Sequence, residues 1–159
     1  MATFLTPYGG TDSTFNHNGG NQLLLEDGDT RIFLDFGSRI GESEVYFNRG
    51  LRPRSTRGLL DYLSFNLVPP LEGLYRDDLS VPSLWEKFRD RDQYRLLVRE
   101  GRPPIDAVLL TQCHIGHAGF IPFLHESIPI FSSVMTGFLN KVMQDTGSGD
   151  IQNELIFAK

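Results

Sequence analysis

The feature that most constrains this chain is an apolar run, Ile105–Leu110, that ends in a cluster of polar and imidazole side chains. Valine, isoleucine and leucine stand together there without alternation, which predicts a strand buried on both faces. A helical pattern of apolar residues follows the cluster, and a second short apolar run, Ile128–Phe131, predicts the next strand. We therefore expect an α/β fold in which a helix begins where the central strand ends. Folds of this class commonly place metals and reacting groups at that end of a strand.

The composition is that of an ordinary globular chain. Its 159 residues are enough for one domain with a sizeable core, and 40% are hydrophobic and 22% charged. The formal net charge of −5 argues against non-specific binding of polyanions by the whole molecule. Cys113 is the single cysteine, so no disulfide can form within the chain. The sequence lacks a signal-peptide pattern and any apolar stretch near the roughly 18 residues of a membrane span, so we expect a cytoplasmic protein without a membrane partner.

The N-terminal part of the chain predicts a β-hairpin preceded by a glycine-rich loop. Thr3–Leu5 fits a short strand ahead of that loop. Asn21–Glu26 and Arg31–Phe36 predict two strands, joined by a turn at Asp27-Gly28-Asp29. The second strand ends near Asp35, a carboxylate that serves either as a turn residue or as an orienting partner for a nearby imidazole.

The longest segment without clear strands is 38–104. Four of its arginines fall within nine residues: Arg49, Arg52, Arg54 and Arg57. They can contact phosphate groups, or they can form a solvated, ion-paired loop. The segment has too few apolar residues for a core of its own. We therefore interpret 38–104 as an insertion or lid within a single domain that spans 1–159.

A helix is predicted after the second apolar run. Ser133 fits its N-cap and Gly147 its C-terminal stop. Apolar residues recur on one face of this helix, at Met135, Phe138, Leu139, Val142 and Met143. We expect this stripe, including both methionines, to be buried in the core.

Two histidines in the polar cluster, His114 and His117, can both reach a cation from a turn that enters a helix. Zinc is bound by neutral imidazole, and a catalytic zinc needs three protein ligands and a water. His17 and His125 are candidates for a third ligand, but no pattern places either of them beside the pair. The same spacing also occurs in histidines at surfaces or helix caps. Cys113 is either a thiolate ligand or nucleophile, or a small buried residue.

The segment Thr111-Gln112-Cys113-His114-Ile115-Gly116-His117 resembles the signature Thr-His-x-His-x-Asp-His of the metallo-β-lactamase superfamily. Gly19-Gly20-Asn21 before the hairpin and Leu34-Asp35-Phe36-Gly37 at its end are similar to that family's opening strands. The Ile-Pro-Phe-Leu and Ile-Pro-Ile-Phe sequences resemble the ribonuclease J-like branch of β-CASP nucleases. The resemblance covers residues 18–37 and 105–147. It implies the first half of an αββα sandwich with a long helical insertion.

Some positions of the implied metal site match the family's pattern, and two depart from it. His114 and His117 match one ligand of each of two zinc ions, and Asp35 matches a carboxylate that supports the metal site. Gln112 and Gly116 stand where the family has a histidine and an aspartate. Both ligand positions are therefore degraded, because an amide is a poor zinc ligand and glycine has no side chain.

The superfamily contains two-metal hydrolases in which a metal-held hydroxide attacks phosphorus or a carbonyl. Its second half supplies the remaining ligands, and no histidine follows His125 in this chain. The resemblance implies a zinc-dependent hydrolase of phosphodiester bonds, such as an RNA-processing nuclease, that needs a C-terminal half or a partner chain to be complete. The alternatives are a catalytically inactive relative used for binding or assembly, and an unrelated α/β binding domain. An isolated half would self-associate through the face that its other half would cover.

Overall fold

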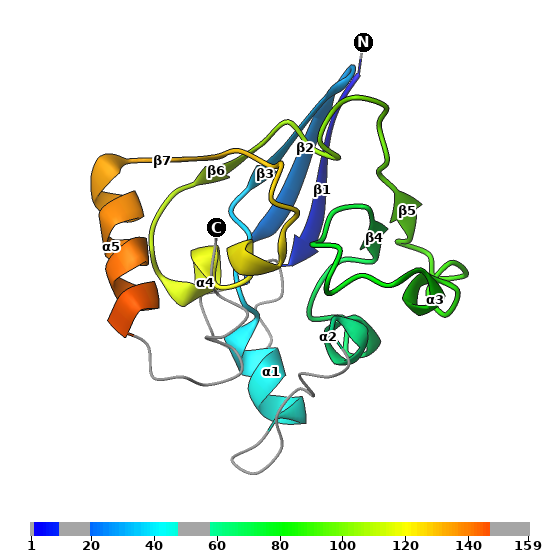
Figure 1. Ribbon diagram of the computed structural model, residues 1–159, viewed down its shortest axis with the longest axis horizontal. Helices are drawn as coiled ribbons and strands as arrows, with labels where there is room; N and C mark the ends of the chain where they lie inside the picture. The colour runs from blue at the N-terminus through cyan, green and yellow to red at the C-terminus, as the bar shows by residue number, and fades with distance from the viewer. Residues whose placement is uncertain (1, 10–19, 48–57, 147–159) are drawn as a thin grey trace.

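The computed structural model describes residues 2–9, 20–47 and 58–146, and their fold is mixed α+β (Figure 1). A five-stranded sheet with the strand order β1-β2-β3-β6-β7 forms its centre. The strands of this sheet are β1 (Thr3–Gly9), β2 (Gln22–Asp27), β3 (Thr30–Leu34), β6 (Ala107–Leu110) and β7 (Ile130–Ser132). The other described elements are α1 (Ile40–Tyr46), α2 (Leu60–Ser64), β4 (Leu71–Glu72), α3 (Pro82–Trp85), β5 (Arg95–Leu96), α4 (Ile115–Ala118), a 3-10 helix (Ile121–Phe123) and α5 (Val134–Thr146).

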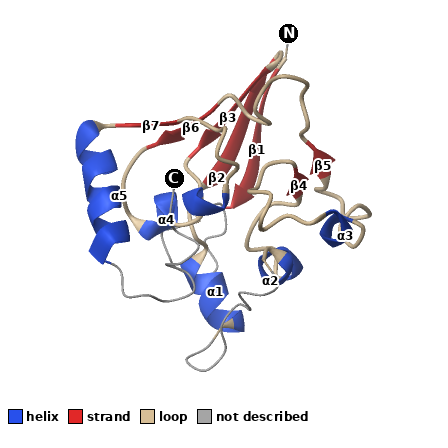
Figure 2. Cartoon of the chain, viewed as in Figure 1, coloured by secondary structure: helices blue, strands red, loops and turns tan. Residues whose placement is uncertain are grey.

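The sheet is mixed, with an antiparallel and a parallel part. β1 pairs with β2 and β2 with β3 in antiparallel fashion, whereas β3–β6 and β6–β7 are parallel (Figure 2). The predicted hairpin is confirmed: Asp27 pairs with Thr30 across a turn in which Gly28 has φ +58°, a conformation that favours glycine. The strands predicted around the two apolar runs also form. β1 is longer than the predicted Thr3–Leu5, because its residues pair with β2 as far as Gly9.

One face of the sheet is the core of the molecule. Leu24, Phe33 and Val108 are cross-strand neighbours on β2, β3 and β6, and all three are fully buried. The ring of Phe33 meets that of Phe36 edge-on with centroids 5.1 Å apart. Burial of such side chains stabilises the fold by about 1.5–3 kcal/mol each.

Residues 38–47 and 58–104, the described parts of the predicted insertion, form a layer that packs on this core face. Aromatic rings continue from Phe36 to Tyr75 and from Tyr75 to Trp85, with centroids 6.4 and 6.1 Å apart. The Gln22 side-chain amide of β2 donates to the carbonyls of Gly37 and Leu67. The segment therefore has no separate core, and its apolar residues share the core of the sheet. In Figure 1 its elements α2, α3, β4 and β5 lie together to the right of the sheet.

The helix predicted after β7 forms, but the prediction that its apolar stripe is buried is wrong. The Ser133 hydroxyl accepts a hydrogen bond from the Thr136 amide at 3.1 Å, as a capping residue does. Thr136 is buried, whereas Met135 and Met143 have exposed fractions of 65% and 50%. Periodicity identifies residues that share a helix face, but it does not say what that face packs on. Gly147, the predicted stop, lies outside the described residues.

The apolar helix predicted after the polar cluster is also shorter than expected. One turn of helix, α4, is followed by the 3-10 helix, whose second residue is Pro122. Proline has no amide hydrogen, so it cannot continue the hydrogen-bond ladder of a longer helix. Among the described residues no helix is both long and apolar enough to cross a membrane.

Candidate functional site

The polar cluster lies where the end of β6 meets the backbone that follows β3. The Gly116 carbonyl accepts hydrogen bonds from the amides of Gly20 and Asn21 at 2.8 and 3.1 Å. The Phe36 amide donates to the His117 carbonyl at 2.8 Å. Three stretches that are far apart in the sequence are therefore fixed to one another by backbone hydrogen bonds. The backbone positions of the residues in the cluster are therefore fixed relative to one another.

Gly37 is required by this close approach. A Cβ atom at that position would lie 1.7 Å from the Gly116 carbonyl oxygen, well inside van der Waals contact. The backbone of the β3–α1 connection can therefore lie against the turn that carries the histidines only because residue 37 has no side chain.

Asp35 is the buried anchor of the cluster, with 4% of its surface exposed. Its carboxylate accepts hydrogen bonds from the Thr111 amide at 2.8 Å and from the Thr111 hydroxyl, which lies 3.0 and 2.9 Å from its two oxygens. Its Oδ2 atom also lies 2.7 Å from Nδ1 of His117. Asp35 has φ +59°, in the left-handed region that is unfavourable for most residues and tolerated by aspartate. The residue is thus both a turn residue and an orienting partner of an imidazole, the two roles that the sequence left open.

His117 is held from both of its ring nitrogens. Nδ1 donates to Asp35, which leaves Nε2 as the nitrogen with a free lone pair in a neutral ring. The side-chain amide of Gln112 lies 2.7 Å from Nε2 and donates to it. The result is a continuous polar chain from Asp35 through His117 to Gln112.

His114 is held differently and is exposed. It is the N-cap of α4, and its Nδ1 accepts a hydrogen bond from the Gly116 amide at 3.1 Å. A neutral ring in that arrangement carries its proton on Nε2, so that atom could bind a cation only if the proton moved to Nδ1 and the hydrogen bond from the Gly116 amide were lost. The centroids of the His114 and His117 rings are 6.4 Å apart. If both rings bound one tetrahedral zinc ion, each through a nitrogen at about 2.0–2.1 Å, their centroids would have to lie closer together than this.

The structure does not bring the other predicted site residues to this cluster. Nδ1 of His125 accepts a hydrogen bond from the Ser127 amide at 3.1 Å. Cys113, which immediately precedes His114 in the sequence, is a partly buried free cysteine. Within the described ranges, no three or more His, Cys, Asp or Glu side chains are grouped so that they could hold a metal ion. His17 and the four arginines at positions 49–57 lie outside the described residues.

A pocket of about 360 Å³ lies elsewhere, and none of its lining residues belongs to the cluster. It has a mixed lining of charged, imidazole and apolar side chains, among them Arg76, Asp78, His125, Glu126 and Ile128. Arg76 is already paired with Asp78 at 2.6 Å. We therefore take the strand-end cluster, and not this pocket, as the candidate site.

Sequence reasoning missed the part that Thr111 and Gln112 play. Thr111 supplies an amide and a hydroxyl to Asp35, and Gln112 supplies the donor to His117. The available signal was their position: both directly follow a buried strand, where side chains turn toward the end of the neighbouring parallel strand. Gln112, which stands where the resemblance implied a histidine, therefore has a contact of its own with His117.

Comparison with known proteins identifies a fold but no family. No family model matches the sequence, and no curated protein matches it. A solved structure does match: the crystal structure of a protein of unknown function from Enterococcus faecalis V583, with a TM-score of 0.56 and 22% identity. The match covers 95% of this chain and 31% of that chain, so this chain spans about a third of the length of its structural neighbour. At this identity the likeness shows a shared fold alone.

Proposed function

We propose that this chain is a domain of metallo-β-lactamase type, the first half of an αββα sandwich, whose metal centre has been replaced by a hydrogen-bonded network. In this proposal the domain does not hydrolyse a substrate on its own and serves in binding or assembly. The proposal is supported above all by one contact: the Gln112 side-chain amide lies 2.7 Å from Nε2 of His117. That nitrogen is the one through which His117 would bind a metal, because Asp35 engages the other.

The donor set of the cluster does not fit a two-zinc centre. A carboxylate that orients a histidine is the usual support of a zinc ligand, and Asp35 and His117 retain it. However, the Gln112 amide occupies Nε2 of His117. His114 accepts a hydrogen bond at Nδ1 from the Gly116 amide and so carries its proton on Nε2. Gly116 has no side chain that could bind a metal. We derive no catalytic step through zinc from these residues.

A second candidate function is a phosphodiester hydrolase that takes its missing ligands from a C-terminal half or a partner chain. The retained Asp35–His117 pair favours it, because a network with only a structural role does not need an imidazole held by a carboxylate. Arg49, Arg52, Arg54 and Arg57 would then contact the phosphates of an RNA substrate.

Zinc binding by the purified protein distinguishes the two functions. We expect elemental analysis to find far less than two equivalents of zinc in the protein as isolated. Replacing the cap, with Gln112→Ala, frees Nε2 of His117 and should raise zinc affinity about tenfold, the scale on which residues around a metal ligand act. Gln93→Ala, at an exposed position, is the matched control and should leave zinc affinity unchanged.

Close to two tightly held zinc ions in the wild-type protein would contradict the first candidate and favour the hydrolase. Equal zinc affinity in the wild-type protein and Gln112→Ala would show that the amide does not block the site.

A further inference from the structure

The central sheet has a second, apolar face, and several of its side chains are exposed in the part of the chain that the structure describes. Cross-strand pairing places Leu5, Leu25, Ile32 and Ala107 in one row, and Pro7, Leu23, Leu34, Leu109 and Phe131 in the next. We call these two rows the open sheet face. Its side chains alternate along each strand with those of the core face, such as Leu24, Phe33 and Val108. Leu5, Leu109 and Phe131 have exposed fractions of 57%, 40% and 59%.

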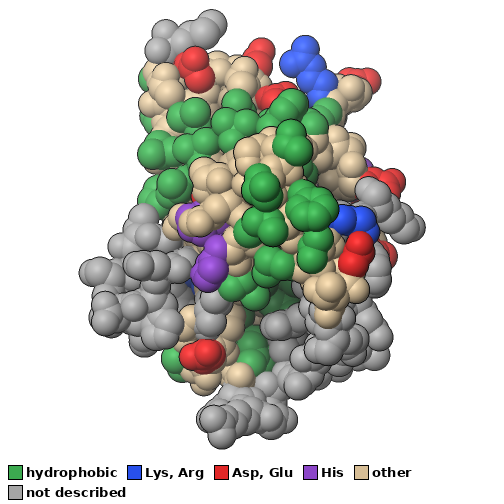
Figure 3. All heavy atoms as spheres, turned by 90° about the vertical axis from the view of Figure 1, so that its left-hand side faces the viewer, with side chains coloured by type: hydrophobic (Ala, Val, Ile, Leu, Met, Phe, Trp, Pro, Cys, Tyr) green, Lys and Arg blue, Asp and Glu red, His purple; other side chains and the backbone are tan. Residues whose placement is uncertain are grey.

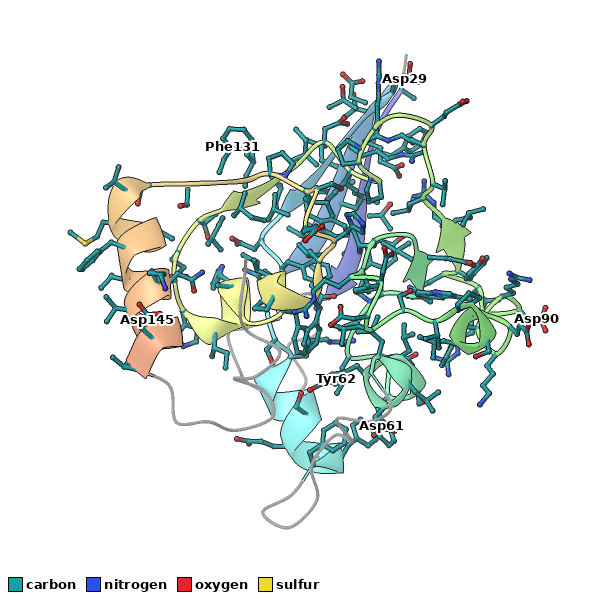
Figure 4. The ribbon with its side chains drawn as sticks, in the orientation of Figure 1. Asp29, Asp61, Tyr62, Asp90, Phe131 and Asp145 are labelled. Carbon is teal, nitrogen blue, oxygen red and sulfur yellow. The ribbon has the colours of Figure 1, made fainter. Side chains whose placement is uncertain are left out.

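The apolar stripe of α5 extends this surface. β7 leads through Ser133 directly into α5, where Val134 is 91% exposed and Phe138 is 62% exposed. Figure 3 shows the side of the molecule on which α5 and β7 lie, and hydrophobic side chains occupy much of it. In Figure 4 the ring of Phe131 points away from the body of the molecule.

The size of this surface is that of a stable interface. If each large apolar side chain presents roughly 150–250 Å², the exposed fractions on the open sheet face and the α5 stripe leave on the order of 1,000 Å² of apolar surface. The largest apolar patch of a typical soluble monomer is about 300–600 Å². A standard protein–protein interface buries about 800 Å² on each partner.

The chemistry of the surface favours a second copy of this chain as its occupant. Neither row of the open sheet face contains a charged residue, so two identical faces can meet without opposing like charges. A polar row borders the apolar rows, where Thr3 donates to Asp27 next to Thr30. On α5, Lys141 is already paired with Asp145 at 2.6 Å. An apolar centre with a polar rim is the anatomy of a protein interface, and it offers nothing to a polyanion.

We propose that the open sheet face and the α5 stripe form the interface of a homodimer in which two copies pack sheet against sheet about a two-fold axis. Faces of twisted sheets pack in this way at a separation of about 10 Å, with side chains from both sheets filling the space between them. The proposal rests on this exposed apolar face and does not use the histidine cluster. A C-terminal half packed on the same face, as the hydrolase candidate allows, would exclude it.

The molar mass of the 159-residue chain in solution tests the proposal. Light scattering after size exclusion should give twice the 18.0 kDa mass of the chain across the micromolar range. The double variant Leu109→Lys/Phe131→Lys places charges in the apolar rows and should give a folded monomer. Val81→Lys, whose residue is 53% exposed beside α3 on the other side of the molecule, is the control and should remain dimeric.

Circular dichroism shows whether each variant is folded. If the sheet variant fails to fold, Met135→Lys/Phe138→Lys on the exposed face of α5 replaces it, with the same expected dissociation. A monomeric wild-type protein, or a dimer that survives both pairs of substitutions, would overturn the proposal. So would open-ended assemblies of mixed mass, because a two-fold interface closes on itself.

Discussion

Asp35, which directly follows β3, has one role through its backbone and another through its side chain. Its backbone is in the left-handed region, and its carboxylate holds both Thr111 and His117. A buried acceptor that loses its donors costs more than a hydrogen bond contributes when it is made. The residue therefore determines both the path of the chain and the orientation of the imidazole.

Replacing Asp35 separates these two roles. Asparagine tolerates the left-handed backbone but presents a donor where His117 also donates, so Asp35→Asn should lower the free energy of unfolding by about 1–3 kcal/mol. Asp35→Ala should cost about 1 kcal/mol more, because alanine also strains the backbone. Urea denaturation of the two variants measures both values. An Asp35→Asn protein as stable as the wild type would show that the network contributes nothing.

Gly37 gives the sharpest steric prediction. Gly37→Ala places a methyl group 1.7 Å from the Gly116 carbonyl oxygen. Neither residue can easily move away, because backbone hydrogen bonds fix both of them. We expect a loss of stability of about 3 kcal/mol or more. Gly137→Ala in α5 is the matched control, since its Cβ would meet only the Ser132 hydroxyl at 3.3 Å and alanine favours a helix by about 1 kcal/mol. Equal thermal midpoints for the two variants would contradict the close approach at Gly37.

At the candidate site, the sequence pointed to single residues, and the structure places Asp35 beside His117. Asp35, His114 and His117 were singled out because carboxylates and imidazoles are few and stand at strand ends. The cap on His117 could not be predicted, because it depends on where the Gln112 side chain turns and not on its position in the chain. The stretches that hold the cluster together meet only in three dimensions, through the Gly116 carbonyl and the amides of Gly20 and Asn21.

At the scale of elements, a charge pair joins the main sheet to the segment 38–104. The guanidinium of Arg95 on β5 donates two hydrogen bonds of 2.7 Å to the Glu26 carboxylate on β2. The hydrogen bond from Arg95 holds the pKa of Glu26 below its ordinary value of 4.5, against the opposing effect of partial burial. Neither partner was singled out from the sequence, because they are far apart along the chain.

This pair predicts an acid-sensitive contribution to stability. Because the pKa of Glu26 is lower in the folded state, its contribution is fully present above about pH 4.5 and is lost as the pH falls through the folded value. In Glu26→Gln the free energy of unfolding should therefore fall less steeply with pH below 4.5 than in the wild type. Urea titrations at a series of pH values measure the slope, with Glu100→Gln at an exposed position as the control. Identical slopes in the wild type and Glu26→Gln would rule out this contribution.

The elements themselves show what periodicity can and cannot predict. The strands around the two apolar runs and the hairpin at Asp27–Thr30 were predicted, because unbroken apolar runs and Asp-Gly turns are local signals. The burial of the α5 stripe was predicted wrongly, because the same stripe fits a core face and an interface. In place of the longer helix predicted after the cluster, the chain forms α4 and then a 3-10 helix that contains Pro122.

At the scale of the whole molecule, the sheet is packed on one face, and on the other face the described residues leave apolar side chains exposed. Residues 58–104 pack on one face, so a stretch in which the sequence shows no clear strand contributes about half of the buried apolar residues of the core. Local composition could not predict this, because its apolar residues are scattered and become a cluster only when they pack on the sheet. The open sheet face is the counterpart, and its two apolar rows are visible only once the strand register is known.

We propose that the fold keeps the framework of a metal site whose ligands have been replaced. Zinc titration of the double variant Gln112→His/Gly116→Asp, followed by calorimetry beside the wild type, tests it most directly. Gly116 lies outside the left-handed region, so an aspartate there is compatible with its backbone. We predict that the double variant binds zinc at least about tenfold more tightly than the wild type, and that adding Asp35→Asn removes most of the gain. Zinc affinity equal to that of the wild type in a folded double variant would contradict the claim.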